Sequence, residues 1–162
     1  MNAERLIKDP KNVNARAEIQ WLASVAHNNF LDAGRRADWG SHRIEHELSA
    51  QYNITHGEGM AVVLVAWTKY MAEKKPWRLA LLASRVYGAD AYDLSERERA
   101  YRLSEELERF FKKLGLKTTL TELGIDDKDF EVMAKRATRN GTVGHYEPLD
   151  AAAFVEILKL AL

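Results

Sequence analysis

Three of the five histidines in this chain lie within sixteen consecutive residues, HRIEHELSAQYNITHG, at positions 42–57. His42 and His46 are four residues apart, so on a helix their side chains point to the same face. His56 follows in a turn beside two glycines, where the bare backbone permits close approach. Imidazole nitrogen is a ligand for zinc and iron, so the cluster predicts a site where a metal or a substrate meets several histidines at once.

A purely structural role competes with this interpretation, because most single histidines on amphipathic helices are partly buried and hydrogen-bonded without binding a ligand. A cluster of three favours the ligand site. The N-terminal end of the helix that follows His56 carries a partial positive charge, which opposes protonation of that imidazole. A neutral imidazole keeps the lone pair that a metal needs, so His56 fits the metal prediction.

The same stretch also matches a metallopeptidase pattern. HRIEH is formally H-x-x-E-H, the inverted zincin signature, in which His42 and His46 bind zinc and Glu45 is the general base. This pattern needs a further acidic ligand downstream, for which Glu122 is the candidate. It leaves His56 without a role, and we keep it as a remote alternative.

Asp38 has two interpretations. It lies four residues before His42, about one helical turn away, so the pair can be read as two ligands of one metal. Aspartate is also a preferred N-cap, and either Asp38 or Ser41 fits as the cap of a helix that runs to about Tyr52. We favour the cap.

Helices must position these residues, because helical periodicity runs through almost the whole sequence. Most of the predicted segments have a start signal and a stop signal, such as the capping box of Ser95 and Glu98 and the glycine at 115. The one candidate strand, VVLVAW at 62–67, has helical flanks that overrule it. We expect an all-α single domain of about six to eight helices over residues 1–162, with helices near 14–33, 41–52, 58–75, 76–88, 94–115, 126–141 and 148–162.

Composition excludes several classes of function. Lys plus Arg and Asp plus Glu both count 24, so no net charge attracts a nucleic acid or an anionic membrane. The chain has no cysteine, which leaves nitrogen and oxygen as metal ligands. No segment is long and apolar enough for a signal peptide or a membrane span, so we expect a cytoplasmic protein that binds neither nucleic acid nor membrane.

The stretch DWGSHRIEHELSAQYNITHGEG, residues 38–59, resembles the signature of the metal-dependent, iron-containing group III alcohol dehydrogenases, closest to their butanol dehydrogenase branch. The resemblance extends over all 162 residues and includes LASRVYG, FFKKLGLKTTLTELGI and the closing helix after Pro148. It implies the C-terminal helical domain of a dehydroquinate synthase-like, metal-dependent alcohol dehydrogenase.

The resemblance also implies roles for the three histidines. His42 and His56 align with residues that bind Fe²⁺, or Zn²⁺ in some members. His46 aligns with a residue beside the metal that is implicated in substrate handling or proton movement, which makes it the catalytic candidate. The reaction implied is hydride transfer between a small alcohol or aldehyde and NAD(P).

The chain departs from the family pattern in two ways. The other two metal ligands, an aspartate and a histidine one turn apart, lie upstream of the region that this sequence covers. So does the nucleotide-binding domain, and Gly57 with Gly59 does not make a dinucleotide motif. We therefore expect the isolated chain to hold metal weakly, to be inactive, and to need an N-terminal nucleotide-binding domain or chain as partner.

Three expectations remain. Apolar surface left by the missing domain favours a homo-oligomer. The alternative function is a non-catalytic helical module or a weak metal-binding fragment. Among the other side chains, Trp21, Trp67 and Trp77 are expected in the core, and Trp39 either in the core or in a pocket wall. Glu45 and Glu47 are candidates to orient an imidazole, although a solvated helix face is favoured for Glu47, and nothing ties His145 to the metal.

Overall fold

The computed structural model describes residues 1–88 and 94–162, and within them the chain forms eight α-helices and one short 3-10 helix. The prediction of an all-α fold is confirmed. Across the described residues the only β pairing is a single antiparallel bridge between Val143 and Leu149. The Cα atoms group into two compact units, Met1–Ala37 and Asp38–Leu162. That residues 1–162 form one domain stays a prediction.

The smaller unit contains α1 (Asn2–Lys8), α2 (Val13–His27) and the 3-10 helix η1 (Phe30–Asp32). The Asn12 side chain caps α2 by accepting a hydrogen bond from the backbone of Ala15. Our prediction of one helix from 14 to 33 was wrong at its end, because Asn29 adopts a left-handed conformation with φ of 63° and stops the helical path. Trp21 is 67% exposed in this unit and is not a core residue.

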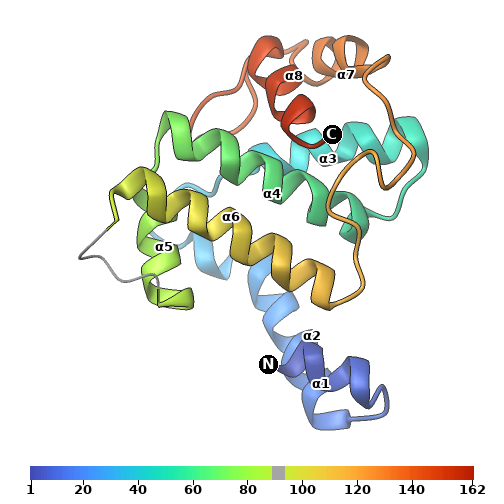
Figure 1. Ribbon diagram of the computed structural model, residues 1–162, viewed down its shortest axis with the longest axis vertical. Coiled ribbons are helices and arrows are strands. Elements are labelled where there is room, and N and C mark those ends of the chain that lie inside the picture. The colour runs from blue at the N-terminus through green and yellow to red at the C-terminus, as the bar shows by residue number, and fades with distance from the viewer. Residues whose placement is uncertain (89–93) are drawn as a thin grey trace. The chain divides into compact units, whose positions relative to one another are not determined.

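The larger unit is built around α4 (His56–Lys74), which contacts α3, α5, α6 and α8 (Figure 1). Ten of its nineteen residues are buried, which confirms the expected central helix. The other helices of this unit are α3 (Gly40–Tyr52), α5 (Trp77–Tyr87), α6 (Glu96–Lys113), α7 (Phe130–Ala137) and α8 (Ala151–Leu160).

Local signals set the starts of two of these helices. The backbone N–H of Ser95 donates to the Glu98 carboxylate, and the Ser95 side chain accepts from the Glu98 backbone, so the predicted capping box is confirmed. Asp150 caps α8 by accepting from the backbone of Ala153 at 2.9 Å. Both α7 and α8 are shorter than predicted. The backbone between them forms a loop that the bridge from Val143 to Leu149 closes.

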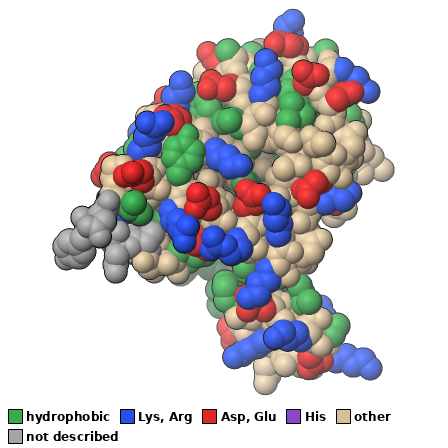
Figure 2. All heavy atoms as spheres, viewed as in Figure 1, with side chains coloured by type: hydrophobic (Ala, Val, Ile, Leu, Met, Phe, Trp, Pro, Cys, Tyr) green, Lys and Arg blue, Asp and Glu red, His purple; other side chains and the backbone are tan. Residues whose placement is uncertain are grey.

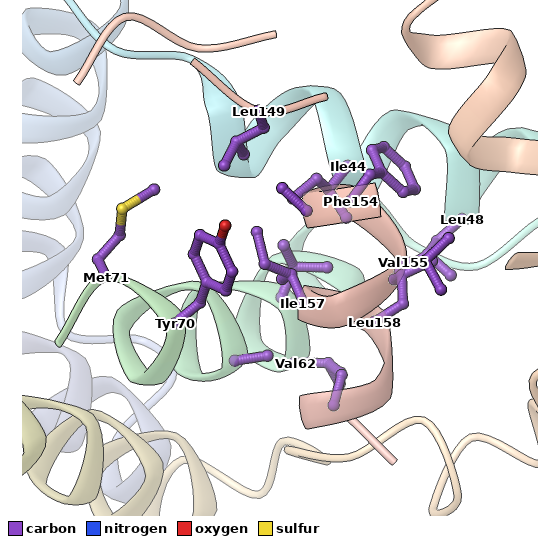
Figure 3. Close-up of a cluster of buried hydrophobic side chains, with 14 of the residues drawn as sticks. Ile44, Leu48, Val62, Tyr70, Met71, Leu149, Phe154, Val155, Ile157 and Leu158 are labelled. Carbon is purple, nitrogen blue, oxygen red and sulfur yellow. The ribbon is translucent and has the colours of Figure 1, made fainter. Parts of the chain in front are cut away.

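The core beneath α3 determines which way its histidines point. Ile44 and Leu48 are fully buried against side chains of α4 and α8 (Figure 3). Successive residues of a helix are about 100° apart, so His42 and His46 lie on the side of α3 roughly opposite to Ile44 and Leu48. Burial of the apolar pair therefore turns the two histidines outward together.

The surface of the larger unit mixes both signs of charge (Figure 2). Around α6, Lys and Arg side chains alternate with Asp and Glu, as in the pairs Arg102–Glu106 and Lys112–Glu108. Trp77, expected in the core, is 44% exposed, and the Arg78 guanidinium lies 4.3 Å from its ring centre. Trp67 is partly buried against the core, as expected. No helix in the described ranges is both long and apolar enough to span a membrane.

Tyr52 provides a pH-dependent link between the end of α3 and the start of α7. Burial and the hydrogen bond that its hydroxyl donates to Asp129 raise the pKa of Tyr52 from 10.0 to about 12. A pKa that is higher in the folded state stabilises the fold below pH 10, and this contribution is lost as the pH rises from 10 towards 12. We expect Y52F to lose less stability than wild type over that range in urea denaturation, and equal losses would contradict this link.

Candidate metal centre

Two helix ends meet at the histidine cluster. α3 ends where Asn53 adopts a left-handed conformation with φ of 53°, and α4 begins three residues later. This short connection brings His56, the first residue of α4, beside the outer face of α3. His56 was expected in a turn, but it stands in the first helical turn instead.

The three imidazoles converge as the sequence predicted. The ring centres of His42 and His56 are 5.3 Å apart, and those of His46 and His56 are 5.4 Å apart. One ligand nitrogen of each histidine lies within 4.8 Å of the others. Among the described residues these three histidines are the group of His, Asp and Glu side chains able to hold a metal together.

This donor set fits a divalent transition metal. Metal–nitrogen bonds of about 2.1 Å keep two nitrogens on one ion within about 4.2 Å of each other. The widest spacing in the cluster is at most 4.8 Å, so a shared ion requires the rings to close by about 0.6 Å. Rotation of an exposed imidazole achieves such a change, and His46 and His56 are both exposed. Two or three imidazoles suit Zn²⁺ or Fe²⁺ rather than the harder Mg²⁺ or Ca²⁺.

Glu45 is buried beside the histidine cluster and is not exposed to solvent. Its side chain is 0% exposed, and its two carboxylate oxygens accept hydrogen bonds from the Ser49 hydroxyl and from Nδ1 of His56. A general base must reach the water that it deprotonates, so this carboxylate does not suit the inverted zincin alternative. Glu122, the ligand which that alternative needs, instead accepts from the backbone of Thr118 and Thr119.

Asp38 does not cap α3. The N-cap residue is Trp39, without a side-chain capping bond, so neither Asp38 nor Ser41 plays the role that we favoured. Asp38 Oδ1 accepts hydrogen bonds from the backbone N–H groups of His145, at 2.5 Å, and of Tyr146, at 3.2 Å. The carboxylate is therefore committed to the loop between α7 and α8, and Asp38 is not a member of the histidine group.

Asp38 holds this loop against the start of α3, where the backbones approach closely. A Cβ atom on Gly144 would lie 2.8 Å from Asp38 Oδ1 and 3.2 Å from the Cα atom of Gly40, and Gly144 has φ of 82°. Only glycine suits a position that combines this crowding with a positive φ.

A cleft of about 470 Å³ opens between the histidine face of α3 and this loop. Trp39 lines it, which decides between the two places that the sequence left open for this side chain. His145 also lines the cleft, which the sequence did not lead us to expect. The available signal was the two glycines, Gly141 and Gly144, because they indicated a tight turn. The cleft wall consists of Trp39, His42, Arg43 and His46 on one side and Ala137, Asn140, Gly141, Thr142, Val143, Gly144 and His145 on the other.

Removing the Asp38 carboxylate tests this anchor. We expect D38A to lower the free energy of unfolding by about 1–3 kcal/mol, because two backbone donors lose their acceptor. The measurement is urea denaturation. E131A is a matched control, since Glu131 is an exposed carboxylate on α7. A change no larger than that of the control would show that Asp38 does not hold the loop.

The chain matches a known protein family and several known proteins in sequence. The model of a family described as "Fe-containing alcohol dehydrogenase family, C-terminal" matches residues 1–162. The chain is 32% identical over 160 residues to a probable NADH-dependent butanol dehydrogenase 1 of Bacillus subtilis, covering 99% of this chain and 41% of that protein. It is 35% identical over 151 residues to NADH-dependent butanol dehydrogenase A of Clostridium acetobutylicum, covering 90% and 38%.

Solved structures agree with the sequence comparison. The crystal structure of an NADH-dependent butanol dehydrogenase A from Thermotoga maritima matches 98% of this chain and 42% of its own, at a TM-score of 0.87 and 33% identity. The Escherichia coli protein YqhD matches 99% of this chain and 41% of its own, at a TM-score of 0.91 and 27% identity. The chain therefore spans about two fifths of the length of these relatives.

Proposed function

We infer that this chain, which belongs to the Fe-containing alcohol dehydrogenase family and matches its C-terminal part, supplies the metal-binding helical portion of an NAD(P)-linked alcohol dehydrogenase. The reaction would interconvert a small alcohol and its aldehyde by hydride transfer. The observation that supports this most strongly is the convergence of three imidazoles at the junction of α3 and α4, beside an open cleft.

Each histidine has a proposed role. His42 and His56 would hold Fe²⁺ or Zn²⁺, and His46, exposed beside them, would handle the substrate or carry a proton. A bound ion supplies Lewis-acid polarisation of the alcohol or aldehyde oxygen. The residues of this chain then bind the ion, orient the substrate in the cleft of about 470 Å³, and exchange a proton with it at the His46 imidazole.

The remaining machinery is proposed to come from residues outside these 162. Relatives named as butanol dehydrogenases are NADH-dependent, whereas the E. coli protein YqhD is named an NADPH-dependent aldehyde reductase. We assign the nicotinamide site, and the two further metal ligands, to a nucleotide-binding domain or chain that completes the cleft. The isolated 162 residues are then inactive, because hydride has no acceptor and the ion has too few protein ligands.

A chimera tests this function. The matched region of the C. acetobutylicum butanol dehydrogenase A would be replaced by this chain, and NADH oxidation with butyraldehyde would be followed after loading with Fe²⁺. We expect turnover by the chimera, background rates with H56A in the same chimera, and none by the isolated chain. A folded, iron-loaded chimera without turnover would contradict the proposal, as would activity of the isolated chain.

The second candidate, a non-catalytic helical module, is favoured by one observation: the two proposed ligands fall short of the three that catalytic zinc sites ordinarily use. Bound iron or zinc at about one ion per chimera would decide for the enzyme. Binding below that level in a folded chimera would favour the module.

Self-association also stays a prediction, and α5 carries the surface for it. Trp77, Leu81, Leu82 and Val86 are all at least 36% exposed. The i, i+4 spacing makes Trp77 a neighbour of Leu81, and Leu82 a neighbour of Val86, on the helix surface, and exposed apolar surface of this kind drives association in water. We expect light scattering of the isolated chain to report a dimer or a larger species. A monodisperse monomer would contradict this prediction.

A further inference from the structure

We propose that Glu45 is the positioning residue of the histidine cluster: it accepts a hydrogen bond from Nδ1 of His56 and so directs Nε2 of that ring to the point shared with His42. This inference rests on the proposed metal site. It adds a residue that touches neither metal nor substrate and acts only through the imidazole.

The burial of Glu45 supports this role. It is a carboxylate with 0% exposure, and the groups that donate to it are the Ser49 hydroxyl, on Oε1, and the His56 ring, on Oε2. A buried carboxylate without donors is strongly destabilising, whereas an apolar side chain of similar size at this position would carry no such cost. A residue whose burial depends on an imidazole donor is better suited to hold that imidazole than to stabilise the fold.

The tautomer chemistry of His56 also supports this role. A neutral imidazole has one N–H and one lone pair, and a carboxylate that accepts at Nδ1 selects the form with the proton on that nitrogen. Nε2 of His56 then keeps its lone pair for a ligand. Metal-bound histidines commonly donate their other ring nitrogen to a carboxylate in this way, which fixes the ring orientation.

Gly59 supplies independent support. A Cβ atom at this position would lie 2.5 Å from Oε1 of Glu45 and 2.9 Å from its Cγ atom. Gly59 is buried within the first turn of α4, one turn after His56, and its backbone has ordinary helical geometry. The glycine therefore provides room rather than conformational freedom, and the space it leaves is filled by the Glu45 carboxylate. At Gly57 an added Cβ would meet nothing within 4 Å, so the crowding is specific to Gly59.

The fold holds Glu45 in place from its other side. The Ser49 hydroxyl, one turn along α3, donates to Oε1 and also lies 3.2 Å from the carbonyl oxygen of Ile54 in the connection to α4. Ile44, the neighbour of Glu45, is fully buried in the core. The carboxylate is thus fixed relative to α3, while His56 stands on α4, and their hydrogen bond joins the two helices where the imidazoles meet.

The test reads the tautomer of His56 directly. Long-range ¹H–¹⁵N correlation spectra of the metal-free chain would be recorded at a pH where the imidazoles are neutral. We expect the Nδ1–H form of His56 in wild type and in E45Q, whose amide oxygen can accept the same hydrogen bond. E45L should lose that form, and G59A should lose it as well, because the added methyl group displaces the carboxylate.

Metal affinity gives a second readout. We expect E45L to bind Zn²⁺ about 10–100-fold more weakly than wild type, the range found for lost partners of ligating histidines. E47Q is the matched control, since Glu47 is on the same helix but pairs with Arg136, and it should match wild type in both measurements. The proposal is overturned if wild-type His56 holds its proton on Nε2, or if E45L keeps both the Nδ1–H form and wild-type affinity. Neither measurement depends on catalytic turnover. Failure of the dehydrogenase proposal can therefore be distinguished from failure of this one.

Discussion

We expect Zn²⁺ binding by the isolated chain to fall more than about 100-fold when His56 is replaced by alanine, a larger loss than the 10–100-fold that removal of a supporting residue causes. His42 and His56 are the proposed ligands of this chain, with ring centres 5.3 Å apart, and H56A removes one of these two ligand nitrogens. H42A should give the same result. Isothermal titration calorimetry, or competition with a chromophoric chelator, measures the affinity.

Two controls sharpen this prediction. H145A removes an exposed histidine that lines the same cleft but lies outside the cluster, and it should bind Zn²⁺ as wild type does. H46A should weaken binding by only a few-fold, because His46 is proposed to stand beside the ion. If H145A and H56A weakened binding equally, the assignment of ligands would be wrong.

Phe154 carries the second large effect, on stability. Its side chain is fully buried beside Ile44 and Leu48, in the packing that turns the histidine face of α3 outward (Figure 3). We expect F154A to lower the free energy of unfolding by about 3–5 kcal/mol, because it removes apolar burial and leaves a cavity. Urea denaturation measures the change.

V132A serves as the matched control for Phe154. Val132 on α7 is 56% exposed, so truncating it should change stability by no more than about 0.5 kcal/mol. A cost below about 1 kcal/mol for F154A would show that the core between α3, α4 and α8 is not packed as described. In that case the orientation of the histidines would lack its physical basis.

The elements that sequence predicted best are those whose ends depend on local interactions. The α6 helix was expected over 94–115 and spans Glu96–Lys113, because its capping box needs only Ser95 and Glu98. The α2 helix was predicted six residues too long. Apolar periodicity continues past its end, and the chain turns at Asn29, a residue type that tolerates left-handed geometry.

Periodicity shows which face of a helix is apolar but not what covers that face. Trp21 and Trp77 lie on apolar faces, as expected, yet both are exposed within the described residues. The sequence had no means of showing this, because coverage depends on elements distant in the chain. The position of Trp39 could not be predicted for the same reason, because the opposite wall of its cleft is a loop about a hundred residues later in the chain.

Around the histidines, too, the sequence predicted features that local interactions set and missed those that depend on distant parts of the chain. Sequence placed the three imidazoles together because spacing on one helix and a short turn are local. It misassigned Asp38, whose partner N–H groups are 107 and 108 residues away. It named Glu45 as a candidate to orient the neighbouring His46, whereas the carboxylate contacts His56, since core packing sets how α3 meets α4.

The zinc X-ray absorption spectrum of the chain with the ion bound tests the proposed metal site most directly. We predict a first shell with nitrogen at about 2.0–2.1 Å and the outer-shell scattering of two imidazoles, reduced to one in H56A. A spectrum with an oxygen shell and no imidazole scattering, identical in wild type and H56A, would contradict it.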